Sequence, residues 1–205
     1  RQVIVVGLLH RLRAAEAAVL RNEGQLYQLA HFDALTRLPN RRYFEEIFNR
    51  QGQLCSRAGA PLSLLLFEID QLEQFRQQRG HVAADEALRD LGLMFAAHAR
   101  RKEDFAARLG EESFALVLPL MAFDDAVRVA EQLRRRTEDM ALGEQLRLTI
   151  SMGVASAELQ RDQDGVALAT LHARAELALS QARGQGGNRV VAHHEPQQRS
   201  SETAC

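Results

Sequence analysis

The amino-acid sequence predicts an α/β fold, an α+β sandwich in which helices flank a mixed β-sheet. Two observations support this fold class. The nearly continuous apolar run over residues 62–69 is typical of a central strand buried on both faces. The stretch over residues 105–118 is apolar at both ends and acidic in the middle, which predicts a β-hairpin. Segments with apolar residues at helical spacing alternate with these strands and favour helices packed on one sheet.

A hinge and a helix precede the central strand. Pro39 biases the residue before it away from helical geometry, and Asn40 is a good N-cap for a helix from about Arg41 to Arg57. A glycine and a proline shortly after this helix end it.

The remaining elements follow from apolar spacing and from glycine breaks. We expect a helical segment after the central strand, interrupted at Gly80-His81 and resuming over residues 82–100. Further helices are expected over residues 123–140 and 168–183, and further strands over 146–155 and 189–191. The polar tail over residues 193–205 is expected to be disordered.

Composition limits the classes of partner and compartment. The chain has 205 residues, of which 46% are hydrophobic, and this suits one globular domain with an appendage. A net charge of −1 gives no basic field, so nucleic acid is not an expected partner. Two cysteines, Cys55 and Cys205, are too few to indicate a disulfide framework and favour a reducing, cytoplasmic location.

Residues 1–30 show a heptad pattern. Its two apolar registers are Val5, Leu12, Val19 and Leu26, and Leu8, Ala15 and Leu29 with Asn22 as the polar member. Four heptads with one asparagine at a seam position predict a parallel coiled coil and hence a homodimer. The alternative is an amphipathic helix packed on its own domain.

The chain opens on Arg1, which indicates a fragment of a longer parent protein with further domains. The apolar run over residues 3–9 is too short to cross a bilayer, which takes about 20 residues. Two interpretations stay open: the run is the end of a transmembrane helix that tethers the domain to an inner membrane, or it is the start of the coiled coil.

The tip of the predicted hairpin is the stretch most suggestive of chemistry. It runs from Arg108 to Phe114 and places Gly110 before the adjacent acids Glu111 and Glu112. Carboxylates and a glycine on such a turn suit a metal–phosphate ligand, and they equally suit a solvated loop.

Several stretches match one family in the right order. They are Asp33-x-Leu35-Thr36-x-Leu38-x-Asn40-Arg41-Arg42, Glu68-Ile69-Asp70, Gly80-His81, Asp85, the hairpin tip, Ser151-x-Gly153-Val154-Ala155 and Gly187-Asn188-Arg189-Val190. Over residues 31–192 the chain resembles a GGDEF domain, the diguanylate cyclase family of bacterial second-messenger signalling. The resemblance implies a mostly antiparallel sheet flanked by helices, as in adenylyl cyclase and polymerase palm domains. It also implies condensation of two GTP into cyclic di-GMP, with one GTP on each of two facing domains.

By this resemblance, Glu68 and Glu112 are the catalytic carboxylates, and Mg²⁺ is held by Glu68, the backbone of Ile69 and Glu112. Two divalent ions would neutralise charge at the α-phosphate and activate the 3′-hydroxyl. Glu68 is one methylene longer than the aspartate usual in the family, and magnesium tolerates little distortion of its ligands.

The hairpin tip departs from the family pattern Gly-Gly-(Asp/Glu)-Glu-Phe. Glu111 replaces the second glycine and Ser113 replaces the fourth-position acid. We expect Glu111 to cost the turn conformational freedom and to repel a polyphosphate, by ~4 kcal/mol for like charges ~4 Å apart at an effective dielectric of 20.

The other nucleotide-binding positions are partly changed. The resemblance assigns nucleotide binding to Gly110, to the guanine-reading pair Arg76 and Asp85, and to the phosphate clamp Arg183. Arg76 stands in place of an asparagine and Arg183 in place of a lysine, while Glu73 reverses the charge of a second family lysine.

Arg101 and Asp104 match the family's Arg-x-x-Asp motif, which forms a product-binding inhibitory site. Arginine offers a planar fork to a guanine edge or a phosphate, and a carboxylate accepts the N1 and N2 protons of guanine. The alternative is an ordinary surface ion pair. A second arginine for this site is expected among Arg128, Arg134, Arg135 and Arg136.

These observations predict a GGDEF-like domain that is impaired or inactive in synthesis and acts as a receptor for cyclic di-GMP or as an interaction module. One alternative is a slow diguanylate cyclase that uses GTP and Mg²⁺. The other is a purely structural dimerisation domain.

Overall fold

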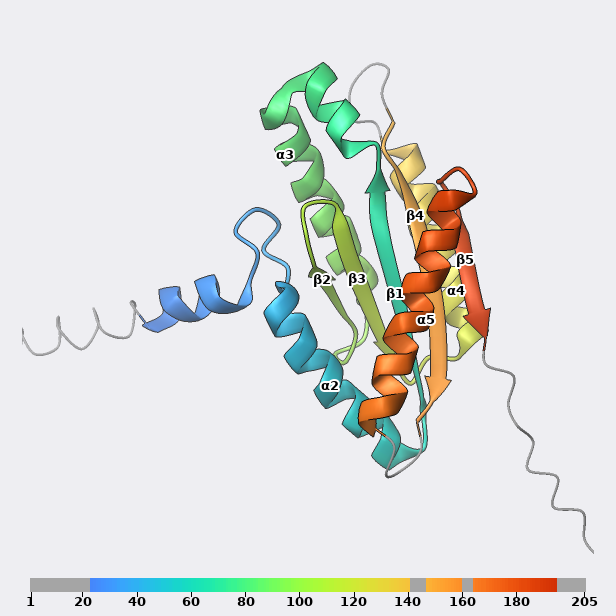
Figure 1. Ribbon diagram of the computed structural model, residues 1–205. Coiled ribbons are helices and arrows are strands. Elements are labelled where there is room, and N and C mark those ends of the chain that lie inside the picture. Colours follow the sequence, from blue (N-terminus) through green and yellow to red (C-terminus); the bar gives the residue numbers. More distant parts are fainter. Residues whose placement is uncertain (1–22, 141–146, 160–163, 195–205) are drawn as a thin grey trace, which may run out of the picture.

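The computed structural model describes residues 23–140, 147–159 and 164–194 (Figure 1). A helix covers residues 23–31. The further elements are α2 (Arg41–Ala58), β1 (Pro61–Asp70), α3 (Leu72–His98), β2 (Phe105–Arg108), β3 (Ser113–Pro119), α4 (Phe123–Asp139), β4 (Thr149–Glu158), α5 (Asp164–Gly184) and β5 (Val190–His194).

The strands form one sheet in the order β2-β3-β1-β4-β5. All neighbours are antiparallel except β4 and β5, which are parallel. The apolar run predicted as the central strand is β1, which is paired on both sides. The predicted mixed, mostly antiparallel sheet is therefore confirmed.

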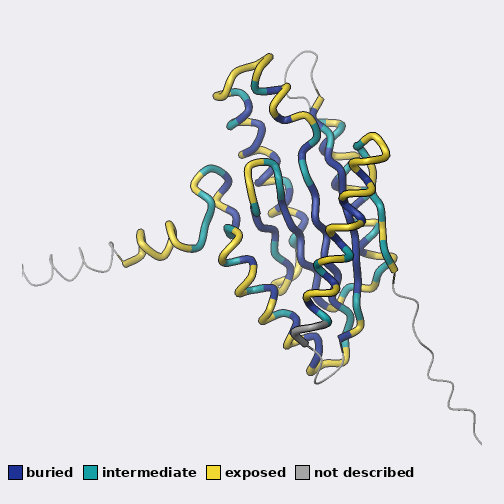
Figure 2. Tube along the Cα trace, viewed as in Figure 1, coloured by how far each residue is buried: buried dark blue, intermediate teal, exposed yellow. Residues whose placement is uncertain are grey.

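Helices cover both faces of the sheet because side chains alternate along β1. Leu65, Phe67 and Ile69 belong to the apolar core shared with α3 and α4. Leu62, Leu64 and Leu66 belong to the core shared with α2 and α5. Figure 2 shows β1, β3 and β4 as the buried centre between exposed outer helix faces.

The helix boundaries near the hinge follow the predicted signals. The side chain of Asn40 caps α2 by accepting from the backbone N–H of Tyr43, and Gly59 ends α2 with a left-handed φ of 60°. Helix α3 is broken at Gly80, whose φ of 85° only glycine adopts readily.

Several boundaries differ from the sequence prediction. Strand β4 covers Thr149–Glu158 rather than residues 146–155, and α5 begins at Asp164 rather than at residue 168. Strand β5 runs to His194, because its pairing with β4 extends to Ser156, so residues 193–194 are not part of a disordered tail. The rest of that tail, 195–205, lies outside the described residues.

The heptad prediction lies largely outside the described residues. Of its positions, Leu26 and Leu29 are described, on the helix over residues 23–31, which extends away from the sheet (Figure 1). Their relative exposures are 63% and 71%, so neither is packed on the domain. Within the described ranges, no helix is long and apolar enough to cross a membrane. The apolar run 3–9 is not described.

Candidate functional site

The hairpin tip between β2 and β3 is held in place by Arg108, whose side chain is only 9% exposed. Its Nε donates to Gly110 O (3.0 Å) and its Nη2 to Glu111 O (2.8 Å). Its Nη1 donates to Asp33 Oδ1 (3.0 Å). One guanidinium therefore fixes the backbone of the tip against the turn that follows the N-terminal helix.

Asp33 is prepared for this contact by its own turn. Its Oδ1 also accepts from the backbone N and the Oγ1 of Thr36, each at 2.8 Å. Burial alone would raise the pKa of the Asp33 carboxyl, but the hydrogen bonds from Thr36 and Arg108 outweigh burial and hold this pKa below its usual value. Asp33 is therefore an ionised anchor for Arg108.

The sheet brings the predicted metal-binding positions to one end of β1. Glu68 lies opposite Ser113 in the register of β1 and β3, and the backbone N of Ile69 donates to Glu112 O at 3.0 Å. The structure therefore places Glu68, Ile69 and Glu112 as neighbours, as the resemblance implies.

The Glu68 carboxylate is bound by protein groups. Its Oε2 lies 2.5 Å from Arg183 Nη1, an ion pair whose angles are not those of a hydrogen bond. Its Oε1 accepts from Ser113 Oγ at 3.3 Å. A divalent cation at Glu68 would have to displace the Arg183 guanidinium, whose side chain is 56% exposed. As the side chains lie, Glu68 is paired with Arg183, and a metal would need that pair to open.

Glu111 does not strain the hairpin, because its φ is not positive. Neither Gly110 nor Glu111 has a positive φ, so the turn does not need a glycine in the left-handed region. A Cβ at Gly110 would also meet nothing closer than Ser113 Oγ at 3.5 Å. The effect of Glu111 is its charge.

That charge faces Arg76 on α3. Arg76 Nη1 donates to Glu111 Oε2 at 3.2 Å, and Glu73 Oε2 lies 3.7 Å from the same nitrogen. The predicted guanine-reading residue Arg76 therefore contacts the hairpin tip. The other member of that pair, Asp85, is partly buried on α3 beyond the break at Gly80.

Arg101 and Asp104 do not form an ion pair with each other. Asp104 Oδ2 accepts from the backbone N of Arg101 at 3.0 Å, while Arg101 Nη1 donates to Leu120 O at 3.4 Å. Asp104 is 8% exposed, and its Oδ1 is buried without a hydrogen-bond partner. Burial raises the pKa of the Asp104 carboxyl above its usual value, against the lowering effects of Arg101.

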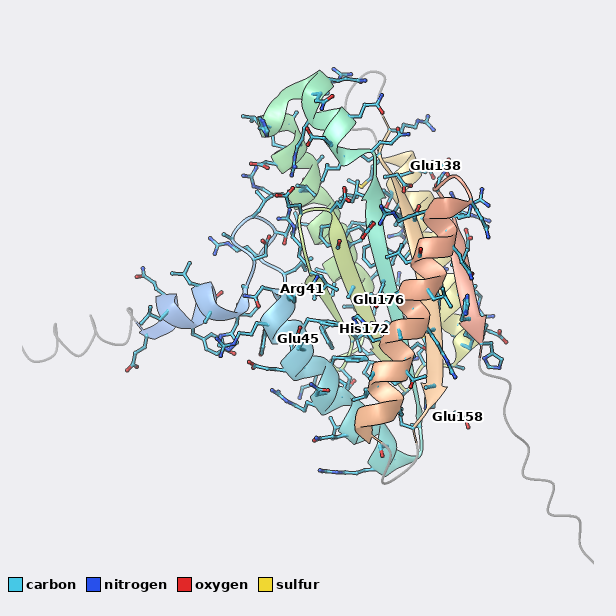
Figure 3. All side chains as sticks on the ribbon, in the orientation of Figure 1. Arg41, Glu45, Glu138, Glu158, His172 and Glu176 are labelled. Carbon is cyan, nitrogen blue, oxygen red and sulfur yellow. The ribbon has the colours of Figure 1, made fainter. Side chains whose placement is uncertain are left out.

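Of the α4 arginines, Arg134 is fully engaged within the domain. It donates to Glu131, to Glu138 and to Asn188 Oδ1. Figure 3 shows Glu138 at the C-terminal end of α4. Arg128 and Arg135 also have acidic partners, Asp125 and Glu131, so the contacts do not select the second arginine among the four candidates.

Comparison with known proteins decides the family. The family model described as diguanylate cyclase, GGDEF domain, matches residues 30–189. The chain belongs to the GGDEF family. The match begins and ends close to the predicted bounds 31–192.

Curated relatives of this GGDEF domain include known cyclases. It is 37% identical over 173 residues to diguanylate cyclase DgcM of Escherichia coli K12, covering 84% of this chain and 40% of DgcM. It is 33% identical over 162 residues to diguanylate cyclase DosC of the same strain, covering 77% of this chain and 34% of DosC. The uncharacterised Bacillus subtilis protein YhcK is 36% identical over 168 residues, with 78% and 45% covered. The chain thus spans less than half the length of these relatives.

Solved structures give the same fold. The coiled coil and GGDEF domain of DgcB from Caulobacter crescentus, in complex with c-di-GMP, superposes with a TM-score of 0.77 at 27% identity, covering 91% of this chain and 99% of that chain. The active GGEEF domain of a diguanylate cyclase from Vibrio cholerae has a TM-score of 0.70 at 29% identity, with 78% and 99% covered.

Sequence reasoning missed the roles of Arg108 and Asp70. Asp70 accepts from Ser151 Oγ (2.6 Å), Thr149 Oγ1 (2.7 Å) and the backbone N of Asn188 (2.9 Å), which ties β1 to β4 and to the turn after α5. An arginine next to the tip and an aspartate at a strand end were visible signals, but their partners are distant in sequence.

Proposed function

We propose that this GGDEF domain is impaired in the synthesis of cyclic di-GMP and acts as a cyclic di-GMP receptor, or as an interaction module, through Arg101 and Asp104. The observation that carries the first half is the state of Glu68. Its carboxylate forms an ion pair with Arg183 at 2.5 Å and accepts from Ser113 Oγ. Glu68, at the family's metal-binding position, is therefore paired with Arg183, at the family's phosphate-clamp position.

The receptor half rests on the Arg-x-x-Asp turn. Asp104 Oδ1 is a buried acceptor without a partner, and buried polar atoms are normally satisfied. Arg101 is exposed, and its side chain donates a long hydrogen bond to Leu120 O. Asp104 is 8% exposed, so its side chain has to turn outward for a guanine N1–H and N2–H pair to satisfy the carboxylate. The Arg101 fork would then bind the other edge or a phosphate. The related DgcB domain binds c-di-GMP.

Calorimetry of the 205-residue chain with cyclic di-GMP tests the receptor. We expect low-micromolar binding that Arg101→Ala abolishes, because the guanidinium supplies the fork. Lys102→Ala is the matched control, since it removes a positive charge from the same turn and should leave binding within about twofold. Absence of low-micromolar binding by the unmodified chain would overturn the receptor role.

The second candidate is a slow diguanylate cyclase, favoured by the adjacency of Glu68 and Glu112 at the end of β1. Incubation with GTP and Mg²⁺ or Mn²⁺ separates the two. Cyclic di-GMP that forms with the unmodified chain and is lost in Glu112→Gln would establish the cyclase instead. If neither assay gives a signal, a structural dimerisation domain is the function that remains.

A further inference from the structure

Two residues that depart from the family pattern contact each other. Arg76 stands at the guanine-reading position of α3 and Glu111 at the second position of the hairpin tip, 35 residues away. They form a hydrogen-bonded ion pair of 3.2 Å between Arg76 Nη1 and Glu111 Oε2. Glu111 alone would place an unpaired negative charge at the proposed nucleotide site, whereas Arg76 neutralises it.

Both partners are held in position from behind. The Arg76 side chain is 18% exposed and has Glu73 one turn before it on α3. The backbone of Glu111 is fixed by Arg108, whose Nη2 donates to Glu111 O at 2.8 Å. The Glu111 carboxylate is 83% exposed, and Arg76 is its only ion-pair partner among the described residues. Arg76 is therefore the less exposed partner, and the Glu111 carboxylate is the solvent-exposed partner.

We propose that Arg76 and Glu111 form a charge latch that excludes nucleoside triphosphates from the site between α3 and the hairpin tip. This rests on the proposed function, in which that site is a nucleotide site no longer used for synthesis. Glu111 engages the Nη1 of Arg76, so this nitrogen is not available to a phosphate or a base edge, and the Glu111 carboxylate repels an approaching polyphosphate. Removing the Glu111 charge leaves Arg76 with only the longer Glu73 contact of 3.7 Å, so its guanidinium can attract phosphate.

A double-mutant cycle tests the latch. GTP binding with Mg²⁺ is measured by calorimetry, at low and at high salt, for the unmodified chain, Glu111→Gln, Arg76→Gln and the double variant. At low salt we expect Glu111→Gln to raise GTP affinity by about fivefold or more, the size of a surface charge interaction. The gain should fall with added salt. Arg76→Gln should weaken binding, because Glu111 is then unpaired.

The decisive quantity is the coupling between the two substitutions. The latch predicts that Glu111→Gln gains at least about fivefold more with Arg76 present than in the Arg76→Gln background, because only a released arginine can contact the ligand. Because residue 111 has no positive φ, Glu111→Gly should gain no more than Glu111→Gln. Additive changes, or no GTP binding in any of the four proteins, would show that the latch is wrong.

The control is an exposed ion pair of the same kind elsewhere. Arg42 Nε and Glu46 Oε1 lie 3.5 Å apart on α2, and the same cycle on this pair should leave GTP affinity unchanged. Thermal melting of every variant excludes unfolding as a cause. Titration of cyclic di-GMP into the same proteins distinguishes the two proposals. Absence of cyclic di-GMP binding would contradict the receptor proposal alone, and absence of coupling between Arg76 and Glu111 in GTP binding would contradict the latch alone.

Discussion

The predicted roles of single residues differed most from the structure where the fold buries or pairs the side chain. Asp104 was expected at a surface motif with Arg101, yet its side chain is turned into the domain and binds the Arg101 backbone. Glu111 was expected to cost the turn conformational freedom and to repel a polyphosphate, and in the fold it has no positive φ and its carboxylate is paired with Arg76. In both cases the residue type was known, and only its surroundings decided its effect.

The raised pKa of Asp104 gives a prediction of pH dependence. Between its usual pKa, near 3.8, and the raised value in the folded chain, the folded state binds more protons at this group than the unfolded state. Relative to Asp104→Asn, the unmodified chain should therefore gain stability as pH falls into this window. Above the window, the buried carboxylate costs stability.

Urea unfolding of both proteins at about pH 7 and about pH 4.5 measures this difference, and the carboxyl of Asp33, whose pKa is shifted in the opposite direction, cancels in the comparison. A loss of stability relative to Asp104→Asn on acidification would contradict the prediction.

At the level of elements, the packing of α5 on β4 positions Arg183 over Glu68. The two elements approach closely because Gly153 has no side chain. A Cβ at this position would overlap the backbone of Ala175 and Leu179, with Leu179 Cα at 2.9 Å. Backbone atoms of a packed helix cannot move aside as the end of a flexible side chain can.

Gly153→Ala should therefore lower the free energy of unfolding by roughly 3 kcal/mol, because α5 has to shift away from the sheet. The matched control is Gly184→Ala at the end of α5, where a Cβ meets nothing within 4 Å and φ is not positive. It should be neutral or stabilising by about 0.5 kcal/mol. Chemical denaturation of both variants measures the difference, and equal stabilities would refute the packing argument.

The sequence predicted most elements because their signals are local. Asn40, Gly59 and Gly80 set helix boundaries through backbone chemistry that depends on one residue. The C-terminal ends of β4 and β5 were predicted too early. Pairing with β1 carries β4 to Glu158, and pairing with β4 carries β5 to His194, and neither partner is visible in the strand's own residues. The site was predicted as a set of positions, but Arg108, which holds the hairpin tip, was not found.

At the level of the whole molecule, the helix over residues 23–31 joins the domain through the hinge. Tyr27 Oη donates to Tyr43 Oη at 3.3 Å, and the His31 ring stacks on Tyr27 with centroids 4.2 Å apart. The seam residues Leu26 and Leu29 remain exposed. These contacts anchor the helix while leaving an apolar face for the partner helix of the predicted coiled coil.

Leu26→Asp/Leu29→Asp should convert a dimeric 205-residue chain to a monomer, because charges at adjacent seam positions are not tolerated in a coiled coil. Light scattering after size-exclusion chromatography measures the mass. Leu177→Asp, on the exposed face of α5, removes another exposed leucine and should leave the dimer intact. A monomeric unmodified chain would refute the coiled-coil dimer.

The sequence by itself determined the order of the elements and the family, and the resemblance predicted the positions that depart from the family pattern. These are local properties: apolar spacing, caps, glycine breaks and residue identity at a motif position. Only the tertiary structure decided which of these side chains contact one another. It paired Arg183 with Glu68 and Arg76 with Glu111, and it buried Asp104. The physical reason is that charge pairing depends on distance in space, which the sheet and its helices set, and a sequence pattern does not contain that distance.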